Sequence, residues 1–177
     1  MYKGGAHMKK LLILGAGGYG RTVAEAAAAL FDEIAFLDDG QTGPDILGPC
    51  ADYERYEGEY AFAYPAFGNN DLRATWLNRL GEAGYDVPAL VHPRAYVSPS
   101  AVVEPGAVVL AMACVGTHTL VRRGAIINMG AVIDHDCTVG FCVHAAPGAI
   151  VKAGNFLAPM TKVESGQVVE RAAYPAP

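Results

Sequence analysis

The chain has 177 residues, of which 52% are hydrophobic and 18% are charged. This composition is too apolar for a disordered protein and is sufficient for one large core or two smaller ones. With a formal net charge of −5 and no basic stripe, no nucleic acid partner is expected. No apolar run reaches the ~20 residues needed to cross a bilayer, so we expect no membrane segment and a cytoplasmic location.

The first seven residues differ in character from the rest of the chain. Residues 1–7 are polar and rich in glycine, and they run into a strand-like segment without a cleavage pattern, so they are not a signal peptide. His7 followed by Met8 is typical of an expression remnant. We therefore expect residues 1–7 to be such a remnant and Met8 to be the natural start.

Residues 8–88 alternate short β-rich runs with helical patterns. Strands are predicted over residues 10–14, 34–37 and 60–67, and an alanine-rich helix over residues 21–31. A second helix is predicted from Asn70, which is expected to cap it, to about Gly81. The order βαβαβ predicts an α/β domain that is half of a Rossmann fold, with a parallel sheet.

A glycine motif comes directly after the first predicted strand. Gly15, Gly17 and Gly20 satisfy G-x-G-x-x-G between a strand and a helix, where backbone amides and a helix N-terminus bind phosphate. Asp38 and Asp39 end the second strand about 20 residues later, where an acid meets a ribose or base in this fold. Because a dinucleotide needs two such halves, the motif favours a single nucleotide diphosphate over NAD; the alternative is a turn that only packs helix on sheet.

A different period begins after Pro88. Every sixth residue from Val91 to Val169 is aliphatic, and most residues four places after each of these are small. This hexapeptide repeat predicts an all-β solenoid over residues 89–174, with three short strands and eighteen residues in each triangular coil. The aliphatic positions, expected to stack into a continuous core, are Val91, Val97, Val103, Val109, Val115, Val121, Ile127, Ile133, Val139, Ala145, Val151, Leu157, Val163 and Val169.

The repeat does not require the polar residues around His135. This histidine stands between Asp134 and Asp136, and a carboxylate beside an imidazole holds one tautomer and makes the ring more basic, as a general base requires. The alternative is a solvated surface histidine. A zinc site is disfavoured and no metal is expected, because the histidines and the four cysteines match no common ligand spacing. The cysteines form no C-x-x-C pair, which fits a reducing compartment.

Five motifs together resemble one family. They are "GAGGYG", "FLDD", "FGNN", "VHPRAYVSPSA" and "NMGAVIDHDCTVGFCVHAAPGA", which span much of the chain from Met8 to about Gly154. The sequence resembles the NeuD and PglD type of sugar acetyltransferases, hexapeptide-repeat acyltransferases with a left-handed parallel β-helix. The resemblance implies an acetyl-CoA-dependent N-acetyltransferase that acts on a nucleotide-linked, UDP-type amino sugar in bacterial surface-glycan synthesis. It also implies a homotrimer in which acetyl-CoA lies between neighbouring β-helices.

The resemblance also assigns roles to residues. His135 corresponds to the general base and Asp136 to its acidic partner. His144 and Ala153 correspond to positions that contact acetyl-CoA. Substrate-binding roles fall on Gly15, Gly17, Gly18, Tyr19, Asp38, Asp39, Gly68 and Asn69.

Two departures from the family pattern leave alternatives open. Tyr19 stands where the family usually has histidine, and the last hexads lack the glycines that normally line the coenzyme site, which predicts a shortened β-helix. One alternative is an O-acetyltransferase acting on sialic acid or another sugar. The other is a non-catalytic trimer that binds a nucleotide sugar but has lost productive acetyl-CoA binding.

Overall fold

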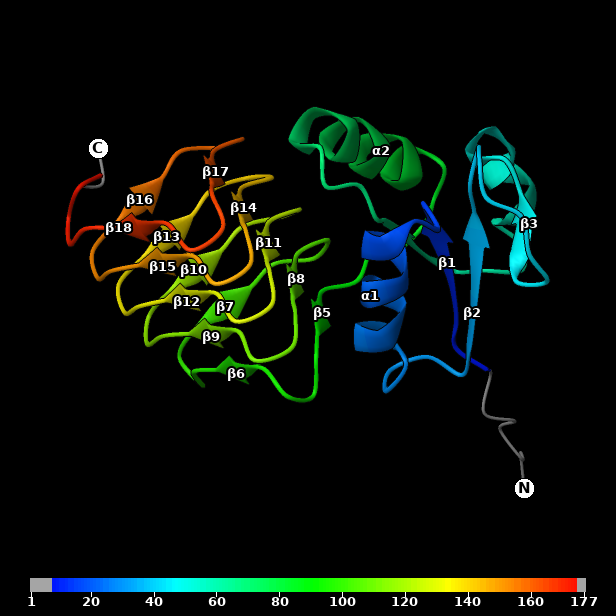
Figure 1. The fold of residues 1–177 in the computed structure, drawn as a ribbon. Coiled ribbons are helices and arrows are strands. Elements are labelled where there is room, and N and C mark those ends of the chain that lie inside the picture. The colour runs from blue at the N-terminus through cyan, green and yellow to red at the C-terminus, as the bar shows by residue number, and fades with distance from the viewer. Residues whose placement is uncertain (1–7, 175–177) are drawn as a thin grey trace, which may run out of the picture.

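A computed structural model describes residues 8–174. The expression remnant predicted for residues 1–7 lies outside the described residues. Beyond Met8 the chain forms an α/β part and a long β-helix that lie side by side (Figure 1).

The α/β part is built on four parallel strands in the order β3-β2-β1-β4. Buried apolar side chains fill β1, which lies in the middle of the sheet between β2 and β4. Two α-helices and a 3-10 helix complete this part. The elements are β1 (Lys10–Leu14), α1 (Gly18–Ala27), β2 (Glu33–Leu37), β3 (Ile46–Gly48), η1 (Cys50–Tyr56), β4 (Phe62–Pro65) and α2 (Asn70–Glu82).

Two helix starts differ from the sequence prediction. Helix α1 begins at Gly18 rather than Arg21, directly after the glycine turn. The cap of α2 is Asn69 and not Asn70, because the Asn69 side chain accepts a hydrogen bond from the N–H of Leu72 at 2.9 Å. The side chain of Asn70 is engaged elsewhere.

The second part is a parallel β-helix of fourteen two-residue strands. Each strand ends on one of the aliphatic positions predicted from the repeat, and these side chains form one continuous core. The strands are β5 (Leu90–Val91), β6 (Tyr96–Val97), β7 (Val102–Val103), β8 (Val108–Val109), β9 (Cys114–Val115), β10 (Leu120–Val121), β11 (Ile126–Ile127), β12 (Val132–Ile133), β13 (Thr138–Val139), β14 (His144–Ala145), β15 (Ile150–Val151), β16 (Phe156–Leu157), β17 (Lys162–Val163) and β18 (Val168–Val169).

The strands stack into three faces. The first face contains β5, β8, β11, β14 and β17, the second contains β6, β9, β12, β15 and β18, and the third contains β7, β10, β13 and β16. Ile126 pairs with His144 in the next coil, so one coil takes eighteen residues, as the repeat predicts. A residue therefore lies beside the residue eighteen positions later.

The α/β part covers the first face of the β-helix. The outward side chains of Leu90, Val108 and Ile126 are fully buried and share a core cluster with Val23 and Ala26 of α1. Figure 1 shows α1 standing against β5 and β8, with α2 lying across the end of this interface. The second and third faces carry no covering element in the described chain.

A buried arginine joins the two parts. Arg73 of α2 is fully buried, and its guanidinium donates to the carbonyl oxygens of Gly124 at 2.7 Å and Cys142 at 2.7 Å. It also donates to the carbonyl of Phe67 and the side chain of Asn70. No carboxylate pairs with this cation among residues 8–174. Its partners are three backbone carbonyl oxygens and the side-chain oxygen of Asn70.

Candidate active site

The glycine turn leaves the start of α1 open. Gly15 has a φ of +99°, and a Cβ on Gly20 would lie 1.9 Å from the carbonyl oxygen of Gly15, so both positions require glycine. A Cβ on Gly17 or Gly18 would meet nothing within 4 Å. The backbone at the N-terminus of α1 is therefore accessible to a ligand, and this is the arrangement that binds phosphate.

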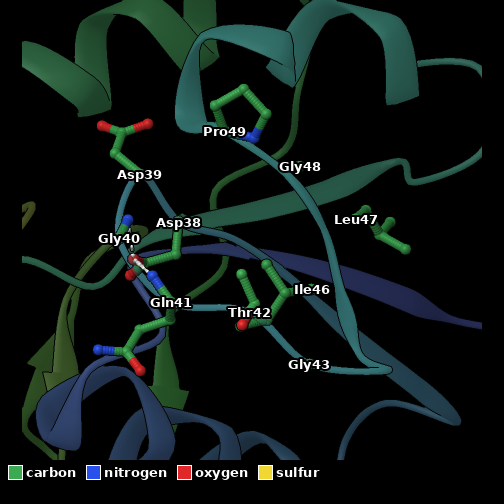
Figure 2. Close-up of a pocket in the computed structure, with 10 residues that line it drawn as sticks. All are labelled: Asp38, Asp39, Gly40, Gln41, Thr42, Gly43, Ile46, Leu47, Gly48 and Pro49. Carbon is green, nitrogen blue, oxygen red and sulfur yellow. Dashed lines mark hydrogen bonds between the residues drawn. The ribbon is translucent and has the colours of Figure 1, made fainter.

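The acids after β2 shape a shallow pocket of about 370 Å³ next to this turn. Asp38 accepts hydrogen bonds from the N–H groups of Ala16, Gly40 and Gln41 at 2.6, 2.8 and 2.7 Å. The bond from Ala16 is the main cause that lowers the pKa of Asp38. Figure 2 shows the Asp38 carboxylate turned toward the loop, whereas Asp39 extends away from it.

Asp38 therefore fixes the loop that carries the pocket. Asp39 uses one oxygen to accept from the N–H of Cys50 at 2.8 Å. Its other oxygen has no partner among the described residues, so Asp39 retains an acceptor for a ligand.

A second cleft, of about 410 Å³, lies where α2 meets the β-helix. Its lining includes Gly68, Asn69, His144 and Lys162. The first turn of α2, which Asn69 caps with its side chain, borders this cleft together with Lys162 and with the carboxylate of Asp71. The helix N-terminus and the lysine favour an anionic group, and Asp71 opposes it.

His144 is held as a neutral ring at the wall of this cleft. The carbonyl oxygen of the Asn128 side chain accepts from the N–H of Met129, so its amide nitrogen donates to Nε2 of His144 at 3.1 Å. Burial lowers the pKa of His144, and the charges of Arg73 and Lys162 lower it further. The proton is thus on Nδ1, which is buried and meets no strict hydrogen-bond geometry in the described chain, although the Gly68 backbone acts on the ring and partly offsets the lowering of its pKa.

Tyr19 does not line either cleft. Its hydroxyl is buried and, like that of Tyr64, lacks a partner of ordinary geometry among residues 8–174. Burial is the main cause that raises the pKa of Tyr19. A hydroxyl in this position does not reach a ligand at the glycine turn unless the side chain moves.

His135 lies in the turn between β12 and β13, at the edge between the second and third faces. Its Nδ1 is 2.6 Å from Oδ2 of Asp136, and the ring is half-exposed. Since an ionised carboxylate only accepts hydrogen bonds, Nδ1 carries the proton and Nε2 has a free lone pair. The bond from His135 is the main cause that lowers the pKa of Asp136.

The same edge holds two further groups. His118, one coil earlier, has Nδ1 at 3.5 Å from the other oxygen of Asp136. Ala153, one coil later than His135, has an N–H that makes no hydrogen bond within the described chain, while the next residue, Gly154, donates to the carbonyl of His135 at 3.2 Å. The predicted residues His135, Asp136 and Ala153 thus share one edge.

His135 and His144 do not meet within one chain. His135 occupies the edge between the second and third faces, whereas His144 lies on the first face against α2. Sequence reasoning missed His118, Asn128 and Arg73. The eighteen-residue interval between His118 and Asp136 was the available signal for the first of these.

No helix among residues 8–174 is long and apolar enough to cross a membrane. No group of three or more histidine, cysteine or acidic side chains in that range is placed to bind a metal ion.

The chain is similar to known proteins over most of its length. Residues 10–80 match the family of the PglD N-terminal domain. The acetyltransferase domain of PglB from Neisseria gonorrhoeae FA1090 is 34% identical, with a TM-score of 0.88 over 92% of this chain and 83% of that one. The same domain in complex with acetyl coenzyme A gives 35% identity and a TM-score of 0.89 over 93% and 83%.

A more distant structure is PerB from Caulobacter crescentus in complex with CoA and GDP-perosamine. It is 26% identical, with a TM-score of 0.81 over 94% of this chain and 91% of that one. No curated protein matches the sequence. These similarities confirm the predicted fold class, an α/β domain followed by a left-handed parallel β-helix.

Proposed function

Because this chain belongs to the NeuD/PglD type of sugar acetyltransferases, we propose that it transfers the acetyl group of acetyl-CoA to the amine of a nucleotide-linked sugar. The observation that carries the proposal is the hydrogen bond from Nδ1 of His135 to Asp136, which leaves a basic Nε2 at an exposed edge of the β-helix. The gonococcal relative binds acetyl coenzyme A, and the Caulobacter relative binds GDP-perosamine.

The chemistry is a direct transfer. The sugar nitrogen attacks the thioester carbonyl, the carbon–sulfur bond breaks, and an amide and free CoA are formed. Nε2 of His135 takes the proton that the nitrogen loses and returns it to the sulfur of the leaving thiolate, while Asp136 stabilises the imidazolium. His135 and Asp136 are thus the proposed catalytic residues.

The free N–H of Ala153 supports a coenzyme site on the same edge. A backbone N–H that faces a thioester oxygen stabilises the negative charge that develops there during attack. Ala153 lies one coil beyond His135, and its neighbour Gly154 is hydrogen-bonded to the His135 carbonyl, so the two groups are adjacent. We assign the coenzyme to this edge, with no metal.

The α/β part is assigned to the nucleotide sugar. We propose that residues 8–88 bind it through the open glycine turn, the pocket at Asp38 and Asp39, and the N-terminus of α2 at Gly68 and Asn69. Residues 89–174 then carry the acyl transfer. The pocket residues accept hydrogen bonds from a ribose or base, and the helix N-termini favour the diphosphate.

We propose a homotrimer in which His144 of one protomer faces His135 of its neighbour. The second and third faces, which flank the His135 edge, carry outward apolar side chains that are exposed in a single chain. Their exposed fractions are 59% for Tyr96, 54% for Val102, 38% for Ile150 and 44% for Val168. Such columns suit burial against another β-helix, and a closed ring uses the same two faces of every copy.

A substrate panel tests the proposed reaction. Purified protein is incubated with acetyl-CoA and a set of UDP- and GDP-linked 4-amino sugars, and the matching sugars with a hydroxyl in place of the amine serve as controls. We expect release of CoA thiol and a mass increase of one acetyl group on an amino sugar. Acetylation of only the hydroxyl sugars would identify an O-acetyltransferase instead.

Ligand-induced stabilisation separates an enzyme from a binding protein. A ligand that binds only the folded state raises the unfolding temperature, and the stabilisation grows with the logarithm of its concentration over Kd. We expect both acetyl-CoA and a nucleotide sugar to stabilise the protein. Stabilisation by nucleotide sugars alone, without transfer to any of them, would contradict the proposed activity.

The assembly is tested with Ile150→Asp, which places a charge on the second face. We expect light scattering to show a trimer for the wild type and a smaller species for the variant, with loss of acetyl transfer. Leu30→Asp in the α/β part is the control, because Leu30 is 46% exposed and lies on no proposed interface. A trimer that survives Ile150→Asp would contradict this arrangement.

A further inference from the structure

His118 is a second imidazole on the carboxylate of Asp136, and the proposed mechanism gives it no role. Its Nδ1 is 3.5 Å from Oδ1 of Asp136, while Nδ1 of His135 is 2.6 Å from Oδ2. One carboxylate therefore lies between two histidines, one on the same turn and one on the turn of the preceding coil.

The eighteen-residue coil places His118 beside Asp136. His118 and Asp136 occupy the same position of their turns, with φ values of +55° and +56°, so their side chains leave the backbone in the same direction. The two turns are joined where the N–H of Asp136 donates to the carbonyl of Thr117 at 2.9 Å. The N–H of His118 donates in turn to Oγ of Ser100 at 3.1 Å. His118 is thus fixed in the turn next to the one that carries His135 and Asp136.

Packing does not account for this side chain. The side chain of His118 is 69% exposed, and the nearest charged group that it faces is the carboxylate of Asp136. The corresponding positions in the coils before and after the pair are Ser100 and Gly154, which carry no charge. Its position against Asp136 therefore matters through polar contact rather than through burial.

We infer that His118 is a positioning residue for the acetyl transfer proposed above. It holds the Asp136 carboxylate in the orientation that serves His135. This inference rests on the proposed function for its meaning in catalysis, but the contact itself is a property of the chain.

The other charged groups of this edge leave Asp136 to the two imidazoles. The Asp134 carboxylate accepts from the N–H of His135. Lys152, one coil beyond Asp134, is paired with Glu170. The contacts of His118 and His135 fall on different oxygens of Asp136, so the carboxylate is held from both sides.

Two substitutions test the contact with Asp136. In His118→Asn the amide nitrogen stands near the former Nδ1 and still donates to Asp136, whereas His118→Ala removes this donor. We expect kcat to fall about fivefold in His118→Ala and to recover in His118→Asn, with KM unchanged in both.

The control is His92→Asn, which alters an exposed turn at a different edge, where His92 accepts from the N–H of Arg94. It should leave kcat unchanged. Unfolding temperatures should be equal for all variants, because His118 is exposed.

A measurement without substrate keeps the two hypotheses apart. The nitrogen chemical shifts of the His135 ring report by NMR which ring nitrogen carries the proton, and we expect the Nδ1-protonated form in the wild type and in His118→Asn and less of it in His118→Ala. If this pattern is seen but no sugar is acetylated by the wild type, the proposed function fails and the positioning role is upheld. If the wild type is active but His118→Ala changes neither kcat nor the tautomer of His135, the inference is overturned.

Discussion

His135 and His144 lie half a coil apart and have opposite surroundings. His135 is half-exposed beside the carboxylates of Asp134 and Asp136. His144 is partly buried beside an arginine and a lysine, and these charges, together with burial, lower its pKa. The repeat places His135 in a turn and His144 in strand β14, and the groups around each ring decide its chemistry. The adjacent carboxylates of the same turn decide it for His135, and the docked α2 decides it for His144.

Removing Arg73 should have the largest effect, because it breaks the surroundings of His144 and the joint between the two parts. Arg73→Met leaves the carbonyls of Phe67, Gly124 and Cys142 without their donor. We expect the free energy of unfolding to fall by about 3 kcal/mol or more, since each buried acceptor left unpaired costs roughly 1–3 kcal/mol. Urea denaturation measures this change.

The control for Arg73 is Arg79→Met on the same helix. Arg79 stacks its guanidinium on Trp76 at 5.0 Å from the ring centre, an exposed contact worth roughly 0.5–1 kcal/mol. Equal losses of stability for the two variants would contradict the role of Arg73 as the joint.

Removing His135 tests whether this residue is the general base. His135→Ala should lower kcat by about 100-fold or more, the usual contribution of a general base, with little change in unfolding temperature. His92→Ala, which removes another histidine from a turn of the β-helix, should retain activity. Steady-state kinetics on the best amino sugar of the panel decide this, and normal turnover by His135→Ala would exclude the assigned base.

The pH dependence of stability tests the neutral state of His144. Because its pKa is lower in the folded chain than the ordinary value of 6.5, the unfolded chain binds the proton first as the pH falls. The stabilising contribution is therefore complete above about pH 6.5 and is lost progressively below it. We expect the wild type to lose more stability than His144→Gln between pH 7.5 and pH 5.5.

The carboxylates with lowered pKa values lose their contribution at a more acidic pH, so they do not obscure this window. Asp38 and Asp136 have folded pKa values below the ordinary 3.8. Parallel stability curves for wild type and His144→Gln from pH 7.5 to pH 5.5 would show that His144 is not held neutral.

The smallest expected effect comes from Lys162. Its charge contributes to the lowered pKa of His144, after burial and Arg73, so Lys162→Gln should raise that pKa. Lys152→Gln is the matched control, since Lys152 is paired with Glu170 at the edge between the second and third faces, away from His144. NMR titration of the His144 ring measures both variants, and an unchanged midpoint in Lys162→Gln would remove the lysine from this electrostatic balance.

The β-helix was predictable almost residue by residue. A six-residue period leaves one register in which every aliphatic side chain points inward, and a slip of one residue would expose the whole set. The α/β part was less predictable. Strand β3 and the 3-10 helix were not predicted, because a three-residue edge strand forms only by pairing with Phe36 and Leu37. The cap of α2 is Asn69 rather than the predicted Asn70, because the Asn70 side chain donates to the carbonyl of Met160.

The candidate site, too, was predictable in one part and not in another. The contact between His135 and Asp136 joins adjacent residues and could be read from the sequence. The eighteen-residue coil would also have placed His118 beside Asp136, but the sequence analysis did not apply it to this residue. The environment of His144 could not be read, because Arg73 reaches it from another part of the chain. The helical spacing of α2 places Arg73 on the buried face with Trp76, Leu77 and Leu80, and Arg79 off that face. The spacing does not show which backbone oxygens the Arg73 guanidinium reaches.

The contacts between α2 and the β-helix limit where coils can be inserted into such a protein during evolution. They fall on Gly124, Cys142 and Met160, which hold the same turn position in three successive coils. Duplicating one coil after Met160 would lengthen the prism and leave these contacts intact. The same eighteen residues inserted between Gly124 and Cys142 would separate two acceptors that Arg73 must reach at once, so insertions of equal length should be tolerated at one site and eliminated at the other.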